Sequence, residues 1–243
     1  MADGRGVAIL VGAGDAIGAA VARRFAEGGY TICICRREAA KSQGLVDELK
    51  AAGHQIHAFS VDARSEAEVQ DLFARVEKEI GPIEVCLFNA GSNVNKPLIE
   101  TTEKLFFKAW ELACYAGFLV GREAARYMVP RGRGTILFTG ATASVRGSAG
   151  FSAFSGAKHA LRALAQSMAR ELGPKGIHVA HVVIDGAIDT AFIRDNFPER
   201  YVRKAEDGIL APDAVAENYW QLHCQQRSAW THELDLRPWI EAW

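Results

Sequence analysis

The stretch VAILVGAGDAIG, residues 7–18, joins an apolar run to a loop with glycines at positions 12, 14 and 18. Residues Val7–Gly12 have the hydrophobicity of a strand that is buried on both faces of a sheet. Glycine after such a strand permits a sharp turn and lets backbone N–H groups at a helix N-terminus approach a phosphate group. The stretch therefore predicts a strand, a phosphate-binding turn and a helix over Ile17–Glu27.

Outward from this stretch, short apolar runs alternate with helical patterns along the rest of the chain. The other predicted strands are 31–35, 55–62, one within 83–91 together with its exit loop, 135–140, 177–185 and 232–236. The other predicted helices are 38–52, one capped by Ser65 with Glu68 in capping-box position, 102–129, 154–172 and one from Pro212. This alternation predicts a Rossmann-type α/β fold, a doubly wound parallel sheet in three α/β/α layers, as a single domain over residues 1–243.

Two segments do not follow the alternation. Residues 187–209 have mixed polarity and weak periodicity, and a segment of this length predicts a lid over a substrate. Residues 228–243 form a Trp-rich tail. Together with the preceding helix, this region holds four of the five tryptophans, Trp220, Trp230, Trp239 and Trp243. Because tryptophan is common at interfaces, the tail is expected to cover the substrate cleft, to contact a partner subunit, or to pack in the core.

The composition excludes several classes of protein. The net charge of −1 favours neither nucleic acid nor a membrane surface, and no apolar run reaches the roughly 20 residues of a membrane span. The early first strand leaves no room for a signal peptide, so a cytoplasmic location is expected. The odd number of cysteines does not suggest disulfides, and buried Cys33 and Cys35 are expected to be structural. No metal is expected, because His178 and His181 lie three apart on a strand and face opposite sides.

Five stretches in order resemble landmarks of the short-chain dehydrogenase/reductase family. VGAGDAIG resembles the TGxxxGxG loop, with Val11 for threonine and Ala16 for the middle glycine. The other four are Asp62 after the third strand, FNAG at 88–91, SGAK at 155–158 and DGAIDT at 185–190, which resembles PGxxxT. The chain is therefore identified as a member of this family, which implies an NAD(P)-dependent oxidoreductase acting on a small carbonyl or alkene substrate.

The resemblance also implies which residues contact the cofactor. They are Gly12, Gly14, Asp15, Ile17, Gly18, Arg36, Arg37, Asp62, Ala63, Asn89, Ala90, Gly91, Lys158, Gly186, Ile188 and Thr190. An acid after the second strand would bind the 2′-hydroxyl of NAD, but here Arg36 and Arg37 suit the 2′-phosphate of NADP. Asp15 argues the other way, because its charge would repel that phosphate. NADP(H) is favoured and NAD(H) is the alternative.

The family's catalytic groups are largely missing at the matching positions. Phe154 lies four residues before Lys158, where the family has its proton-donating tyrosine. Ala141 takes the place of the serine and Cys114 that of the asparagine, so Lys158 alone remains. Thr142 is the candidate for a hydroxyl that reaches the substrate oxygen.

Two functions remain open on the sequence. One is an oxidoreductase with a non-standard active site, supported by the cofactor residues, Lys158 and the lid. The other is a catalytically silent nucleotide-binding protein that acts as a sensor, scaffold or partner subunit, supported by the missing catalytic groups. The family resemblance further implies a homodimer or homotetramer formed through the helices 102–129 and 154–172.

Overall fold

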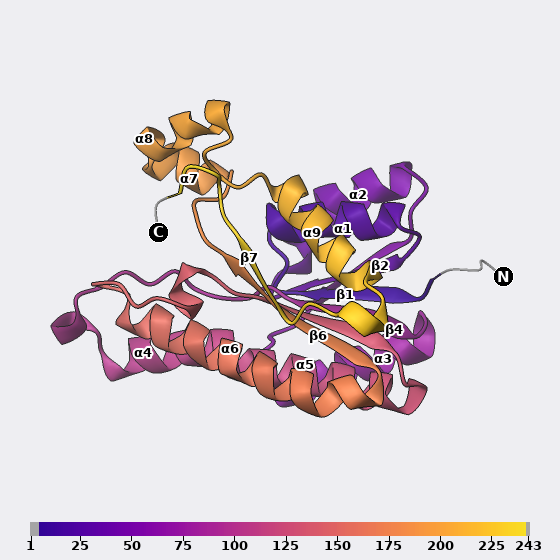
Figure 1. Ribbon diagram of the computed structural model, residues 1–243. Coiled ribbons are helices and arrows are strands. Elements are labelled where there is room, and N and C mark those ends of the chain that lie inside the picture. The colour runs from indigo at the N-terminus through magenta and orange to yellow at the C-terminus, as the bar shows by residue number, and fades with distance from the viewer. Residues whose placement is uncertain (1–4, 242–243) are drawn as a thin grey trace.

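A seven-stranded parallel sheet lies at the centre of the computed structural model, which describes residues 5–241 (Figure 1). The strands are β1 (Val7–Val11), β2 (Thr31–Arg36), β3 (Ile56–Ser60), β4 (Ile83–Phe88), β5 (Gly134–Thr139), β6 (Ile177–Ile184) and β7 (Glu233–Leu236). Their order is β3-β2-β1-β4-β5-β6-β7, and every neighbouring pair is parallel. The chain thus winds outward in both directions from β1 and β4, which confirms the predicted fold class.

Helices cover both faces of the sheet, as Figure 1 shows. One layer holds α1 (Ile17–Glu27), α2 (Gln43–Ala51) and α9 (Pro212–Cys224), and the other holds α3 (Glu66–Glu79), α4 (Glu103–Trp110), α5 (Ala116–Met128) and α6 (Ser152–Leu172). Each layer encloses a separate apolar core. The strands β1, β2, β4 and β6 are buried on both faces because alternate side chains enter each core.

Three predicted elements differ in detail from the structure. The helix expected over 102–129 is broken by a π-helical turn at Glu111–Tyr115, which separates α4 from α5. The helix expected over 38–52 begins with a 3₁₀ turn at Ala39–Ser42. The segment 187–209 is not irregular throughout, because it contains α7 (Ala191–Asn196), α8 (Pro198–Tyr201) and a 3₁₀ helix at Val202–Glu206. Such short helices bury too few residues to leave a clear period in the sequence.

The predicted cap of α3 by Ser65 is confirmed, but the Glu68 side chain bonds to a different backbone N–H than the capping box predicts. The Ser65 hydroxyl accepts a hydrogen bond from the Glu68 backbone N–H at 3.4 Å. The Glu68 carboxylate, however, accepts from the N–H of Asp62 at 2.9 Å rather than from that of Ser65. This contact ties the end of β3 to the start of α3.

The cysteines and histidines considered above lie on the buried strands β2 and β6. Cys33 and Cys35 are buried and free. His178 stacks on Trp230, whereas His181, from the opposite face of β6, bonds to Glu233. Within residues 5–241 no group of three metal-ligating side chains comes together. No helix in this described range is long and apolar enough to cross a membrane.

The tryptophans of the C-terminal region have separate surroundings. Trp220 lies in α9, where its ring meets Phe25 and the guanidinium of Arg24, so it belongs to ordinary packing between α9 and α1. Trp230 packs on the sheet through His178. Trp239 is 77% exposed and donates a hydrogen bond to the backbone oxygen of Glu206. Trp243 lies outside the described residues.

Candidate functional site

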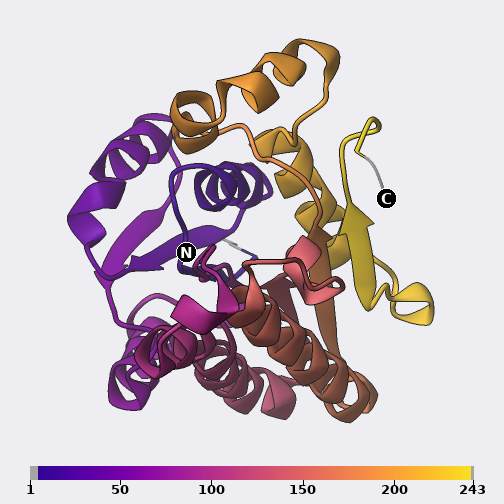
Figure 2. The ribbon, with the colours of Figure 1, turned by 90° about the vertical axis from the view of Figure 1, so that its left-hand side faces the viewer.

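The loops that follow the parallel strands gather at one edge of the sheet, the end near α7 in Figure 1. Figure 2 shows this end face on, with α7 and α8 above the sheet and the segment after β7 beside them. Ligands of doubly wound sheets bind at this edge, where the chain reverses its winding direction. Here that reversal lies between β1 and β4.

The three glycines of the loop after β1 have different surroundings. A Cβ on Gly12, where φ is +76°, would lie 2.6 Å from the Cβ of Ala90, so the turn must be glycine. A Cβ on Gly18 would lie 2.6 Å from the Cα of Ala13, because α1 packs closely on its own turn. At Gly14, by contrast, a Cβ would meet no described atom within 4 Å. Gly14 therefore presents open backbone, as the approach of a pyrophosphate requires.

The end of β2 places Arg36 against this glycine loop. Its guanidinium donates a 2.7 Å hydrogen bond to Asp15 and a 3.4 Å bond to the backbone oxygen of Lys41. The Asp15 side chain is 83% exposed and that of Arg36 only 20%. Arg37 is exposed and makes no hydrogen bond or ion pair within residues 5–241. Two cations therefore stand at the position where a 2′-phosphate would be bound.

The end of β3 brings an acid to the same edge. Both carboxylate oxygens of Asp62 accept hydrogen bonds from the Arg64 side chain, at 2.9 and 2.6 Å. These bonds lower the pKa of Asp62, which stays ionised at neutral pH. Ala63, which follows it, is buried in the core beside α3.

The turn after β4 contacts both the glycine loop and α6. The N–H of Asn89 donates to the backbone oxygen of Val11 at 2.8 Å, which holds this turn against the end of β1. A Cβ on Gly91 would lie only 3.1 Å from the Nζ of Lys158. Asn89, Ala90, Gly91 and Lys158 thus come together, although Lys158 is far from the others in sequence.

Lys158 lies beneath the turn after β4, next to Gly91, and is 4% exposed. Its Nζ donates a 2.8 Å hydrogen bond to the backbone oxygen of Thr139 at the end of β5. Burial lowers the pKa of Lys158 to about 8, because the ammonium form loses its hydration. The ammonium keeps N–H groups that can donate to a ligand hydroxyl.

Phe154 lies one helical turn before Lys158 on α6, and its ring centroid is 6.5 Å from that of Phe151. Ala141 stands at the start of the loop after β5. Cys114 lies within the π-helical turn between α4 and α5, and burial raises the pKa of its thiol. Single π-turns inside helices frequently mark functional sites. None of these three side chains is an acid at neutral pH.

Thr142 and Asp185 form the one direct hydroxyl–carboxylate pair at this edge within the described residues. The Thr142 hydroxyl donates to Asp185 at 2.5 Å, and Asp185 is 4% exposed. Guanidinium nitrogens of Arg237 and Arg146 lie 3.5 and 3.9 Å from the same carboxylate. The positive charges compensate the buried carboxylate, which then fixes the orientation of the Thr142 hydroxyl.

The segment after β6 turns toward α7 through Gly186, where φ is +150°. Ile188 pairs with Leu210, and the hydroxyl of Thr190 caps α7 by accepting from the N–H of Ile193 at 3.1 Å. The chain after β7 covers this turn, because a Cβ on Gly186 would lie 2.8 Å from the Cδ of Pro238.

Asp185, Arg237 and Pro238 were not among the residues expected to form the site. The one available signal was the aspartate in DGAIDT, at the point where the resembling PGxxxT segment has proline. The pairing of Asp185 with Arg237 joins residues that are far apart in sequence, so local patterns could not predict it.

Taken together, the edge of the sheet offers open backbone at a helix N-terminus, cations after β2, an ionised acid after β3 and a buried lysine beside Gly91. These groups suit the pyrophosphate, the adenosine ribose and its substituents, and the hydroxyls of a second ribose. The residues present therefore fit a dinucleotide.

Comparison with known proteins gives the same assignment. A family model for short chain dehydrogenases matches residues 6–200. A short-chain dehydrogenase from Rhodopseudomonas palustris is 48% identical, with a TM-score of 0.83 over 96% of this chain and 99% of that one. A 7α-hydroxysteroid dehydrogenase in complex with NADH and 7-oxo glycochenodeoxycholic acid is 26% identical, with a TM-score of 0.88 over 97% and 94%.

Among curated proteins, the short-chain dehydrogenase/reductase eriH of Hericium erinaceus is 29% identical over 219 residues, which are 88% of this chain and 85% of that protein. The family model covers well over half of the chain and includes the glycine loop, the turn after β4, Lys158 and Thr190. The chain therefore belongs to the short-chain dehydrogenase/reductase family of oxidoreductases.

Proposed function

We propose that this protein is an NAD(P)-dependent oxidoreductase that favours NADP(H) and works with a non-standard active site. The observation that carries the proposal is the contact between Lys158 and Gly91 below an open glycine loop. Lys158 is 4% exposed and its ammonium donates to one protein acceptor, the Thr139 backbone oxygen, so its other N–H groups suit the hydroxyls of the nicotinamide ribose. The substrate is a small carbonyl or alkene compound, and residues 187–209 act as its lid.

The cofactor positions are those that the sequence predicted, with a specific role for each group. Gly12, Gly14, Ile17 and Gly18 form the phosphate turn, and Asp62 with Ala63 faces the adenine. Asn89, Ala90 and Gly91 line the centre of the site, while Gly186, Ile188 and Thr190 hold the nicotinamide end. Asp15, Arg36 and Arg37 lie at the adenosine ribose, where the two arginines favour a 2′-phosphate.

The active site lacks the usual proton donor, because the Phe154 ring has no proton to transfer. Thr142 takes over the contact to the substrate oxygen. The Thr142 hydroxyl donates to Asp185 at 2.5 Å, so its oxygen can accept a hydrogen bond from the hydroxyl of an alcohol, the product of carbonyl reduction. The proton that a carbonyl or alkene needs besides the hydride comes from solvent, from the substrate itself, or from Thr142 when its hydroxyl turns away from Asp185. Lys158 binds and orients the cofactor. A bound nicotinamide would supply the redox chemistry.

The second candidate is a silent nucleotide-binding protein. It is favoured by the absence of an acidic side chain at Phe154, Ala141 and Cys114. Both candidates require dinucleotide binding, so turnover is the property that separates them.

The test combines binding with turnover. NADPH and NADH are titrated into the protein by nucleotide fluorescence, and oxidation of NADPH is then followed with a panel of aldehydes, ketones and activated alkenes. Turnover that is lost in Thr142→Val and retained in Thr142→Ser supports the oxidoreductase. Binding without turnover, in both the wild type and Phe154→Tyr, would favour the silent protein, and absence of binding would overturn both.

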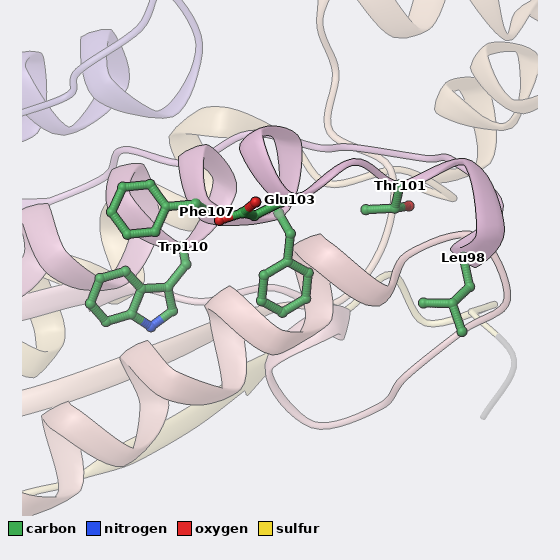
Figure 3. Close-up of a pocket in the computed structure, with 6 residues that line it drawn as sticks. Leu98, Thr101, Glu103, Phe107 and Trp110 are labelled. Atoms are coloured by element: carbon green, nitrogen blue, oxygen red, sulfur yellow. The ribbon is translucent and has the colours of Figure 1, made fainter.

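The protein further forms a homodimer or homotetramer through the α4–α6 face. Leu98, Ile99 and Phe107 are 71%, 97% and 55% exposed there. Leu98 and Phe107 line an open apolar hollow to which Trp110 of α4 also contributes (Figure 3). Light scattering should give a dimer or tetramer for the wild type and a smaller species for Phe107→Glu. A monomeric wild type would contradict this. The cytoplasmic location stays a prediction.

A further inference from the structure

The carboxylate of Asp185 lies next to the Thr142 hydroxyl, at the edge of the sheet where the parallel strands end. Thr142 begins the 3₁₀ turn Thr142–Ser144 after β5 and is half-buried, whereas Asp185 follows β6 and is 4% exposed. The hydroxyl donates to the carboxylate at 2.5 Å. Since Thr142 is the more accessible of the two, a substrate in the site contacts its hydroxyl first.

We propose that Asp185 takes up the proton of an alcohol substrate through the hydroxyl of Thr142. The inference rests on the proposed function, which places Thr142 on the substrate oxygen, and it adds the group that finally holds the proton. An alcohol side chain cannot keep a second proton at neutral pH, but a carboxylate can accept one. Asp185 thus acts through Thr142 and does not itself touch the substrate.

The oxidation balances in atoms and electrons. The O–H bond of the alcohol breaks while a new O–H bond forms on Thr142 Oγ1, and the former Thr142 proton moves to a carboxylate oxygen of Asp185. The carbon-bound hydrogen leaves with its electron pair to an oxidised nicotinamide dinucleotide, and the C–O bond becomes a carbonyl. The proton on Asp185 afterwards passes to water, and reduction of a carbonyl uses the same two side chains in reverse order.

The charges around Asp185 suit a carboxylate that is ionised between turnovers. Guanidinium nitrogens of Arg237 and Arg146 lie 3.5 and 3.9 Å from it, which offsets the cost of burying its charge. Arg237 is shared with the more exposed carboxylate of Asp235, with which it also forms an ion pair. Arg237 therefore does not serve Asp185 alone, and Asp185 keeps its capacity to accept a proton.

The central variant is Asp185→Asn, whose amide oxygen still accepts the Thr142 hydrogen bond but cannot take up a proton. Single turnovers of benzyl alcohol, cyclohexanol and isopropanol with NADP⁺ are followed by stopped-flow absorbance of the NADPH formed. Asp185→Asn should slow the turnover about 100-fold or more and leave Kd for NADP⁺ within about twofold. Thr142→Val should lose as much, and the double variant no more, because the two groups act as a unit.

Asp235→Asn is the matched control, since it removes a carboxylate from the same arginine but not from Thr142. It should leave the turnover rate within about threefold of the wild type.

Two further measurements separate proton transfer from a structural role. In the nucleotide-free protein, the infrared carboxylate band that Asp185→Asn removes should shift in Thr142→Val and stay in place in Asp235→Asn. In the wild type, the single-turnover rate in mixtures of light and heavy water should fall along a curve, because two protons move together. A straight line would overturn the inference even if Asp185→Asn failed to fold.

The outcomes distinguish this inference from the proposed function. Wild-type turnover in Asp185→Asn, or an equal loss in Asp235→Asn, would overturn the inference alone and show that Asp185 merely holds the loop after β5. An infrared band that Thr142→Val does not move would overturn it as well. A wild type that binds NADP⁺ but turns over neither these alcohols nor the carbonyl panel would overturn both the inference and the oxidoreductase, and absence of nucleotide binding would overturn the proposed function in either form.

Discussion

The hydroxyl of Thr142 and the carboxylate of Asp185 are joined by a 2.5 Å hydrogen bond across the ends of β5 and β6. The carboxylate is almost completely buried, and the guanidiniums nearest to it lie at 3.5 and 3.9 Å, so Thr142 is its closest side-chain donor. The stability of this edge therefore depends on a threonine hydroxyl as well as on charge compensation.

Replacement of Thr142 by valine keeps the shape of the side chain but removes the donor. A buried carboxylate without this bond is destabilised, so Thr142→Val should lower the free energy of unfolding by about 1–3 kcal/mol. Thr142→Ser keeps the hydroxyl and should lose less. Urea denaturation checks both variants, and equal stability of the valine and serine variants would show that the bond contributes nothing.

Lys158 should make stability depend on pH above neutrality. Burial lowers its pKa from 10.5 to about 8 in the folded state, so the folded protein releases the proton before the unfolded chain does. Between these two values the unfolded chain holds more protons, and a rising pH favours the folded state. The total effect is about 3 kcal/mol, since one pKa unit corresponds to about 1.4 kcal/mol.

This contribution must be separated from that of other groups. Burial raises the pKa of Cys33 to about 12, which has the opposite sign, because the unfolded chain then loses its thiol proton first. The measurement is therefore the difference in unfolding free energy between the wild type and Lys158→Met, from pH 7.5 to 10.5. This difference should move in favour of the wild type as the pH rises, and a flat difference would contradict the lowered pKa.

Alanine at Gly14 and at Gly12 should have opposite consequences. At Gly14 the new methyl group meets open space, so Gly14→Ala should fold with a stability within about 1 kcal/mol of the wild type. It should weaken NADPH at least about tenfold, because the methyl group occupies the space of the pyrophosphate. Gly12→Ala should instead lose more than about 2 kcal/mol, from strain and from the contact with Ala90. Calorimetry and nucleotide titration distinguish the two, and unimpaired NADPH binding by Gly14→Ala would contradict the assignment of the loop.

The segment after β7 should hold residues 202–208 in place. Ile240 packs against Gly208, and Trp239 donates a 2.8 Å hydrogen bond to the backbone oxygen of Glu206. Ile240→Asp should therefore increase the rate of tryptic cleavage after Arg203 and Lys204, which are exposed. Trp239→Phe loses only the hydrogen bond and should cause a smaller increase. Mass spectrometry of the early fragments checks this, and cleavage at the wild-type rate in both variants would contradict it.

The fold could be predicted because most of its strands are short, apolar and followed by a helical pattern, as in Val7–Val11 and Ile17–Glu27. The limits of α1 agree with the prediction residue by residue, since its glycine turn and apolar face are both local signals. The π-turn that contains Cys114 was missed, because a single extra residue in a turn hardly changes the period of a helix.

The sequence could single out those residues of the candidate site that belong to short motifs, such as the glycine loop and the SGAK stretch. The contact of Lys158 with Gly91 and the pair of Arg36 with Asp15 bring together residues that the sequence had singled out one by one. Asp185 and Arg237 were missed, because their meeting depends on where the chain returns after β7. Such long-range charge pairs leave no period and no spacing in the sequence.

The position of Pro238 beside Gly186 has a consequence for the order in which the site is assembled during translation. The glycine loop, the cations after β2 and the buried lysine are all synthesised long before residues 237–240 leave the ribosome. Domains generally fold as units during synthesis, N-terminal parts first. A chain that folds during its synthesis can therefore form the contact between Lys158 and Gly91 before Pro238 covers the turn after β6.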